Sequence, residues 1–332
     1  MAREARPARV THFFPAPADD YERGVLERVA QWEGPAGLEA LTPAVLRELT
    51  AREGCDFATA LLHQRIVESE RHGPFLRALA EPPEGSRLPG VRVAIVPGAF
   101  YRENPRTGAD GRVARKVATQ LGLPVVLIPV SSTGSLNENA TIIAEWLDQN
   151  RHDPLILVSV SKGGSDLKCA LARADAARLF GQVVAWVNLC GILDGTPMAD
   201  WLLSPALLAR ANRLVYRLRG RSLAFVTDMR RYPGCALDFP LTLPARLRAV
   251  HVIGFPLRRH LHNGLARRCH VRLESFGPND GSILLADAPS WPGQLCPVWG
   301  ADHYLRPRTD ERPLLAALLR ICATSGGIPV PP

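Results

Sequence analysis

The spacing of hydrophobic positions changes near residue 90. Beyond it, short continuous apolar runs rich in β-branched residues recur, as is typical of strands buried on both faces. The runs cover residues 91–100, 123–130, 154–161, 182–193, 247–257 and 293–305, and a further strand is predicted at 270–280. Helical spacing lies between several of them and again at 310–322. Strands that alternate with helices predict an α/β protein with a mostly parallel sheet and helices on both faces.

The section before residue 81 has helical periodicity and little strand character. Val25, Leu26 and Val29 lie near one face of a predicted helix. Thr42 before Pro43 is typical of a helix N-cap followed by proline at the first helical position. Proline and glycine then cluster at 81–90. We predict a helical N-terminal extension over 1–88 that docks on a domain over 89–325, with a protein partner as the alternative role.

The third apolar run, LILVSVSKGGSD at 155–166, ends in small polar residues. Ligands gather at the carboxyl ends of the strands in open α/β sheets. A nucleophile elbow, G-x-S-x-G, needs small flanking residues because the turn is tight. Ser161 fits this pattern with Gly163, although Ser159 replaces the first glycine. A plain loop or a phosphate site is the alternative, but neither G-x-x-x-x-G-K-[ST] nor G-x-G-x-x-G is present.

A serine nucleophile requires a base, and the base requires an acid that orients it. Asp280 follows the predicted strand at 270–280 in the turn FGPNDG, and His303 follows the last predicted strand in VWGADHYL. Each could instead have a structural role, as turn residue or core histidine. Asp302, Asp194 and Asp287 are alternative acids. Three residues in the order Ser, Asp, His, each after a predicted strand, favour a catalytic triad.

With SVSKGG (159–164), GPNDGSIL (277–284), WGADHYL (299–305) and GTPMADW (195–201), the chain from about 91 to 322 resembles the lipase- and esterase-like branch of the α/β-hydrolases. The resemblance implies hydrolysis of a carboxylic ester through an acyl-enzyme at Ser161, with His303 as base and Asp280 as orienting acid. It also implies an oxyanion hole formed by the backbone N–H of Lys162 and that of Ala99 or Phe100. A thioesterase, an acyltransferase or an inactive binding module on the same fold is the alternative.

Two further features follow from the resemblance. Lys162 stands where many relatives have His, Met or Gln, and its side chain is either solvated or turned toward an anionic substrate. Residues 196–245 interrupt the strand–helix alternation and are predicted to form a helical cap. The cap offers apolar side chains that either line an acyl pocket or pack as ordinary helices: Trp201, Leu202, Leu203, Leu207, Leu208 and Leu214.

Composition narrows the function classes. The net charge is +8, and only three of the 40 basic residues are lysines. The basic residues are dispersed, the densest cluster lies at 257–270, and no aromatic platform accompanies it. We therefore predict no nucleic-acid partner, and at most an attraction to anionic substrates or membrane surfaces. The expected partner is a small acyl ester or thioester.

The remaining chemistry is predicted to be simple. His251, His260, His262, Cys269 and His270 cluster without a metal-binding spacing, so we predict no metal and no cofactor. The seven cysteines are scattered and odd in number, which favours reduced thiols and a cytoplasmic protein. The first twenty residues contain no apolar stretch typical of a secretory signal, and no run suits stable membrane insertion.

Overall fold

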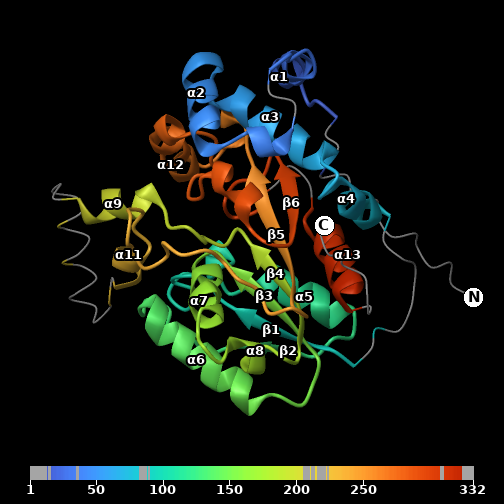
Figure 1. Ribbon diagram of the computed structural model, residues 1–332, viewed down its shortest axis with the longest axis vertical. Coiled ribbons are helices and arrows are strands. Elements are labelled where there is room, and N and C mark those ends of the chain that lie inside the picture. The colour runs from blue at the N-terminus through green and yellow to red at the C-terminus, as the bar shows by residue number, and fades with distance from the viewer. Residues whose placement is uncertain are drawn as a thin grey trace, which may run out of the picture.

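The computed structural model describes residues 13, 16–34, 37–81, 88, 90–204, 210, 214, 222, 224–306 and 310–323. Within them, the chain builds one parallel sheet surrounded by helices (Figure 1). The strands are β1 (Arg92–Val96), β2 (Val125–Leu127), β3 (Leu155–Val160), β4 (Val183–Leu189), β5 (Arg248–Phe255) and β6 (Gln294–Trp299). Their order across the sheet is β2-β1-β3-β4-β5-β6, and every neighbouring pair is parallel. The predicted α/β architecture is confirmed.

Helices cover both faces of the sheet. On one face α5 (Arg112–Gln120) packs beside α13 (Arg312–Ala323), and on the other α6 (Leu136–Gln149) packs along α7 (Lys162–Leu171) (Figure 1). The short α8 (Ala176–Leu179) follows α7. α9 (Pro197–Leu203), α11 (Ala224–Asp228) and α12 (Gly264–Leu273) lie on the left in Figure 1, the side on which α6 and α7 lie. Because both faces are covered, the strands carry the continuous apolar runs that the sequence shows.

The N-terminal section forms α1 (Asp20–Ala30), α2 (Pro43–Glu53), α3 (Cys55–Glu68) and α4 (Gly73–Ala80). Thr42 caps α2 as predicted, its hydroxyl accepting from the Val45 N–H. On α3, His63 stacks edge-on against Phe255 and Trp299 of the sheet. These helices therefore share one hydrophobic core with the strands. The domain boundary at residue 88 and a protein partner for this section stay predictions.

Short 3₁₀ turns connect the larger elements. The turns are η1 (Leu38–Ala40), η2 (Pro105–Thr107), η3 (Arg258–His260), η4 (Glu274–Phe276) and η5 (Leu285–Ser290).

The prediction of a strand at 270–280 is wrong. Residues 270–280 belong to the end of α12, to η4 and to the turn after it. Asn263 caps α12, and its buried positions Ala266, His270 and Leu273 follow helical spacing. Because the middle one of these buried positions is a histidine, the sequence shows no continuous apolar stripe with helical spacing here.

In the described part of the chain, no helix has the length and apolar character that crossing a membrane requires.

Candidate active site

The order of the strands creates a crevice at the carboxyl end of the sheet. The chain leaves β1 toward β2 on one side, whereas β3 leads to β4 on the other, although β1 and β3 are neighbours. Such a topological switch point separates the two following loops and leaves room for a ligand. Val96 pairs with Ser159 across these strands. The loop at Gly98 and the residue Ser161 therefore lie side by side at the end of the sheet.

Ser161 occupies the tight turn between β3 and α7. Its backbone has φ 50° and ψ −116°, a strained conformation for a residue with a side chain. The turn presents the hydroxyl at the sheet edge and directs the first amide groups of α7 toward the same space. This is the geometry of a nucleophile elbow, which the pattern S-x-S-x-G predicts.

The two glycines after Ser161 are required by close backbone approach. A Cβ on Gly163 would lie 2.3 Å from the Val96 carbonyl oxygen. A Cβ on Gly164 would lie 2.6 Å from the Oδ1 of Asn188. Both distances are far below van der Waals contact, so α7 can pack this tightly against β1 and β4 only because residues 163 and 164 carry no side chain.

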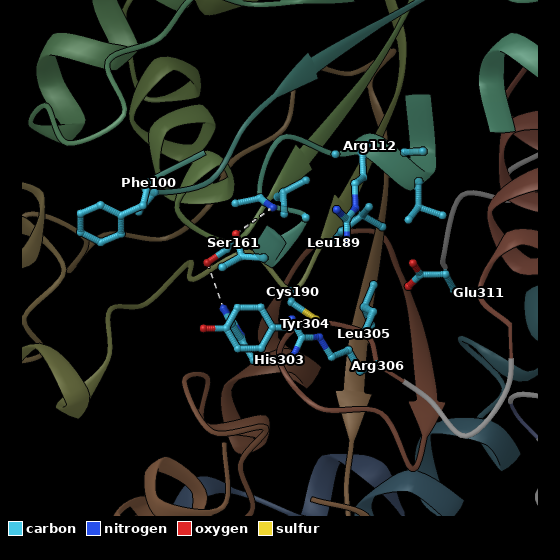
Figure 2. Close-up of a pocket in the computed structure, with 18 of the residues that line it drawn as sticks. Phe100, Arg112, Ser161, Leu189, Cys190, His303, Tyr304, Leu305, Arg306 and Glu311 are labelled. Atoms are coloured by element: carbon cyan, nitrogen blue, oxygen red, sulfur yellow. Dashed lines mark hydrogen bonds between the residues drawn. The ribbon is translucent and has the colours of Figure 1, made fainter. Parts of the chain in front are cut away.

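The three residues of the predicted triad meet at this edge. Ser161 Oγ lies 2.9 Å from His303 Nε2, as Figure 2 shows. His303 Nδ1 lies 2.9 Å from Asp280 Oδ2. The Asp280 carboxylate accepts a hydrogen bond from the protonated Nδ1 of His303. Nε2 therefore carries no proton and can accept a hydrogen bond from the serine hydroxyl. Ser161 is half-buried, whereas Asp280 is 1 % exposed and His303 8 % exposed.

A rigid turn holds the Asp280 carboxylate. Its other oxygen, Oδ1, accepts hydrogen bonds from the backbone N–H groups of Ser282 and Ile283, at 2.8 and 2.7 Å. The Asp280 carbonyl accepts from the His303 N–H at 3.0 Å, which ties the acid turn to the histidine loop. Gly281 takes the left-handed conformation, φ 97°, that this turn requires. The turn role and the orienting role of Asp280 are thus compatible.

The environment of His303 shifts its pKa upward. Burial lowers the pKa of the imidazole, but the Asp280 carboxylate raises it through charge and hydrogen bond, and Asp302 adds to the increase. The net pKa lies above the ordinary 6.5. A more basic imidazole accepts the serine proton more readily.

The alternative acids have other partners. Asp302 Oδ1 accepts from the backbone N–H groups of Tyr304 and Arg306. Asp194 binds the ammonium of Lys168 and the indole N–H of Trp291. Asp287 pairs with Arg231. Of the four acids considered, Asp280 is the one hydrogen-bonded to the His303 ring.

Two backbone amides remain for an oxyanion next to Ser161. The Phe100 N–H donates to the Ser132 carbonyl at 3.2 Å, so it is already engaged. Within the described residues, no hydrogen bond is found for the Ala99 N–H, and Ala99 lines the same cavity as Ser161. Lys162 is the first residue of α7, where the amide N–H has no partner inside the helix. The structure therefore favours Ala99 and Lys162 over Phe100.

Both expectations for the Lys162 side chain are wrong. It is 1 % exposed, and its ammonium binds both carboxylate oxygens of Asp166 at 2.8 and 2.9 Å. Asn139 of α6 donates to the same carboxylate at 3.0 Å. Burial raises the pKa of Asp166 to about 6, although Lys162 opposes the increase. Neither Lys162 nor Asp166 lines the cavity in front of Ser161, and the hydrogen bond from Asn139 joins the first turn of α7 to α6.

A buried hydrogen-bond chain explains why serine replaces glycine at position 159. Trp186 Nε1 donates to Ser159 Oγ at 2.8 Å, and Ser159 Oγ donates to Asn188 Oδ1 at 2.7 Å. Asn188 Nδ2 donates to His251 Nδ1, and His251 Nε2 donates to the Pro292 carbonyl. Burial lowers the pKa of His251 to about 4, so the ring is neutral and fits these roles. These hydrogen bonds link β3, β4 and β5 beneath the turn that carries Ser161.

We expect Ser159→Ala to destabilise the fold by about 1–3 kcal/mol, because Trp186 and Asn188 would each lose a buried partner. Chemical denaturation followed by circular dichroism measures this change. Ser275→Ala, at an exposed serine after α12, is the matched control and should change the free energy of unfolding by less than about 0.5 kcal/mol. Equal stability of the two variants would contradict the stabilising role proposed for the buried hydrogen bonds of Ser159.

An open cavity of about 840 Å³ lies in front of Ser161 and His303 (Figure 2). Next to the serine its wall is apolar, with contributions from Leu189, Cys190 and Leu305. Farther along, charged side chains line it: Arg112, Arg306 and Glu311. Burial, followed by the charge of Asp310, raises the pKa of Glu311 to about 7. The cavity can thus receive a molecule with an apolar portion near the serine and a polar portion beyond it.

The residues that were expected to line an acyl pocket lie elsewhere. Trp201, Leu202 and Leu214 are 38 %, 42 % and 58 % exposed, and Leu203 packs at the margin of the core. None of these four lines the cavity. Leu207 and Leu208 lie outside the described residues. Within 196–245, the described helices are α9 and α11, and Phe225 of α11 packs edge-on against Phe100 beside the cavity.

The clustered histidines have structural partners. His260 Nδ1 accepts from the Leu257 N–H, and His270 Nδ1 donates to the Asn279 carbonyl. His262 is exposed and Cys269 half-buried. Among the described residues, the close group of potential metal ligands is Cys190, Asp280 and His303, within 4.8 Å of one another. Two of its members belong to the hydrogen-bonded triad, and burial raises the pKa of the Cys190 thiol well above its usual value.

Comparisons with known proteins place the fold. No family model matches the chain, and no curated protein matches it. Among solved structures, the metagenomic carboxyl esterase MGS0156 is 23 % identical, with a TM-score of 0.53 over 72 % of this chain and 77 % of that one. Phospholipase PlaB from Legionella pneumophila is 10 % identical, with a TM-score of 0.50 over 71 % of this chain. This chain spans 60 % of the length of that phospholipase.

The chain has the α/β-hydrolase fold. The likeness covers about seven tenths of the chain, as expected from the motifs between residues 91 and 322. In the α/β-hydrolase fold the nucleophile stands on the turn after a central strand, and Ser161 stands at that position here.

Proposed function

We propose that this protein is a serine hydrolase that cleaves a carboxylic ester through an acyl-enzyme at Ser161. One observation carries the proposal. A hydroxyl, an imidazole and a carboxylate are joined by two 2.9 Å hydrogen bonds, and the hydroxyl opens onto a cavity of about 840 Å³. A structural histidine would not need a strained serine and a buried carboxylate on its two sides.

In the proposed reaction, His303 Nε2 takes the Ser161 proton while Oγ attacks the ester carbonyl carbon. The resulting imidazolium is stabilised by the Asp280 carboxylate, which stays ionised. The tetrahedral intermediate collapses when Nε2–H protonates the leaving alkoxide, which departs as an alcohol. Water then attacks the acyl-Ser161 by the same route and releases a carboxylic acid.

The carbonyl oxygen becomes negatively charged in each tetrahedral intermediate. The amide groups of Ala99 and Lys162 lie beside Ser161, where they can donate to this oxygen. Loss of one such donor costs about 3 kcal/mol of transition-state stabilisation. The Lys162–Asp166 ion pair supports this arrangement because it fixes the first turn of α7, which carries the Lys162 amide.

A panel of p-nitrophenyl esters of increasing acyl length, with matched acyl-CoA thioesters, tests the proposal on the full chain. We expect saturable hydrolysis of at least one ester and a preference among acyl lengths set by the apolar part of the cavity. Faster cleavage of the thioesters would reassign the protein as a thioesterase. Rates equal to those of heat-denatured protein across the whole panel would contradict the proposal.

The pH dependence should follow His303. Protonated His303 cannot accept the serine proton, so kcat/KM should fall as the pH drops through its pKa, which lies above 6.5. Because Glu311 also titrates near pH 7 in the cavity, Glu311→Gln is the control. The acid limb should remain in that variant. If the limb disappears with Glu311→Gln, or lies well below pH 6.5, the assignment of His303 as base is wrong.

A further inference from the structure

The outer face of α12 and the adjoining part of α9 carry an unusual surface, here called the α12 face. α9 and α12 lie next to each other, at the edge of the molecule in Figure 1. The Arg272 guanidinium lies 4.4 Å from the centroid of the Trp201 ring, which joins the two helices. The α12 face comprises three exposed apolar side chains and four arginines: Trp201 of α9, Arg258 of the neighbouring η3, and Leu265, Arg267, Arg268, Val271 and Arg272 of α12.

The apolar members of the α12 face are open to solvent. Leu265 is 53 % exposed, and Val271 and Trp201 are each 38 % exposed. Single exposed apolar residues are ordinary. Here Val271 lines a shallow hollow together with the four arginines, and Trp201 contacts Arg272 of the same face. The buried stripe of the same helix already packs against the protein through Ala266 and Leu273. The α12 face therefore adds nothing to the core of this chain.

Within the part of the chain that the structure describes, positive charge predominates on the α12 face. No acidic residue occurs within α12. Among the described residues, no ion pair is found for the side chains of Arg258, Arg267, Arg268 or Arg272. Two acids lie at the margin of the α12 face: Glu274 lies 3.8 Å from His270, and Asp56 accepts from Tyr21 and from the Arg258 N–H, but neither forms an ion pair with these arginines. In contrast, many other exposed arginines of the chain are paired, such as Arg173 and Arg178.

We propose that the α12 face binds the surface of an anionic lipid bilayer, as a peripheral contact that does not span it. Arginine binds lipid phosphate groups through several N–H donors at once. Leucine, valine and tryptophan side chains can enter the boundary between headgroups and acyl chains. Charge complementarity and the interleaving of the two residue types favour this partner. Nucleic acid would instead favour aromatic platforms along a groove, whereas Trp201 is the one aromatic residue of the α12 face.

The proposed membrane contact does not depend on the catalytic function, but hydrogen bonds connect α12 to the turn that holds Asp280. His270 of α12 binds the Asn279 carbonyl, and the Asn279 side chain donates to the His270 carbonyl. Asn279 directly precedes Asp280, and Ser282 of the same turn lines the catalytic cavity. A bilayer bound at the α12 face would thus lie next to the turn that holds the acid.

Sedimentation of the full chain with large vesicles tests this proposal. Vesicles contain either phosphatidylcholine alone or equal parts of phosphatidylcholine and phosphatidylglycerol. We expect binding to the anionic vesicles, weak binding to the neutral ones, and loss of binding as salt is raised. Each arginine near an anionic surface contributes about fivefold to affinity, so Arg267→Gln with Arg268→Gln should weaken binding about 25-fold.

The control removes two positive charges elsewhere, with Arg77→Gln on α4 and Lys116→Gln on α5, both exposed. It should bind vesicles like the unaltered chain. A separate variant, Leu265→Ser, should bind the anionic vesicles more weakly at low salt, because one apolar contact with the bilayer is removed. Circular dichroism confirms that each variant is folded. If both charge variants lose binding equally, net charge alone is responsible and the proposal is wrong. Absence of vesicle binding, or binding to duplex DNA but not to vesicles, also overturns it.

Discussion

Replacing Ser161 with alanine is expected to lower kcat for the best ester of the panel by about 10⁴-fold or more, with little change in KM. The alanine removes the atom that forms the acyl-enzyme, while the cavity and the oxyanion amides remain. Steady-state kinetics measure the loss, and an unchanged melting temperature shows that the fold is intact. Alanine has a Cβ like serine and no larger side chain, so we expect residue 161 to keep its φ of 50° in the variant.

Ser159→Ala is the matched control for this experiment. Ser159 stands two residues earlier, is fully buried and binds Asn188 and Trp186 rather than His303. Measured at a temperature where it is folded, this variant should keep kcat within about tenfold of the unaltered chain, because it leaves the reacting atoms in place. Comparable losses from the two serines, or an active Ser161→Ala, would show that Ser161 is not the nucleophile.

Asp280→Asn is expected to lower kcat by about 10⁴-fold without unfolding the protein. The asparagine amide has nearly the same shape, and its oxygen can still accept from the N–H groups of Ser282 and Ile283. However, the amide NH₂ would then face His303 Nδ1 and favour the tautomer with its proton on Nε2. That tautomer cannot accept the serine proton.

Asp302→Asn tests whether the effect belongs to Asp280. Asp302 precedes His303 in the chain, but its carboxylate accepts from the backbone of Tyr304 and Arg306. Its charge raises the pKa of His303 only as a minor contribution, so we expect a small downward shift of the acid limb and a change in kcat of less than about tenfold. A larger loss with Asp302→Asn than with Asp280→Asn would reverse the assignment of the orienting acid.

The sheet could be predicted because its strands, apart from the half-buried edge strand β2, are buried on both faces. Such strands need nearly continuous apolar sequence, and all six are visible as runs of that kind. The segment at 270–280 misled the prediction because α12 is a surface helix whose buried stripe includes His270, and whose exposed face carries Leu265 and Val271.

Residues of the site differ in how far the sequence could reveal them. The elbow at Ser161 is a local pattern, and the order of Ser161, Asp280 and His303 is a pattern of the whole chain. Their catalytic roles stay a prediction, although the structure brings the three side chains into contact. The Lys162–Asp166 ion pair has the i, i+4 spacing of a helical pair and could have been read from the sequence. Its burial beside Asn139 and the hydrogen bond between Phe100 and Ser132 could not be predicted, because these partners approach from other elements.

The proposed reaction requires that His303 activates Ser161. Reaction with a fluorophosphonate, followed by mass spectrometry of the peptides, tests it most directly, because only an activated serine in a folded site attacks the phosphorus. We expect one label per chain, on Ser161, absent after denaturation and greatly slowed in Asp280→Asn. Failure of the folded protein to react, or a label on another residue that persists in Ser161→Ala, would contradict the account.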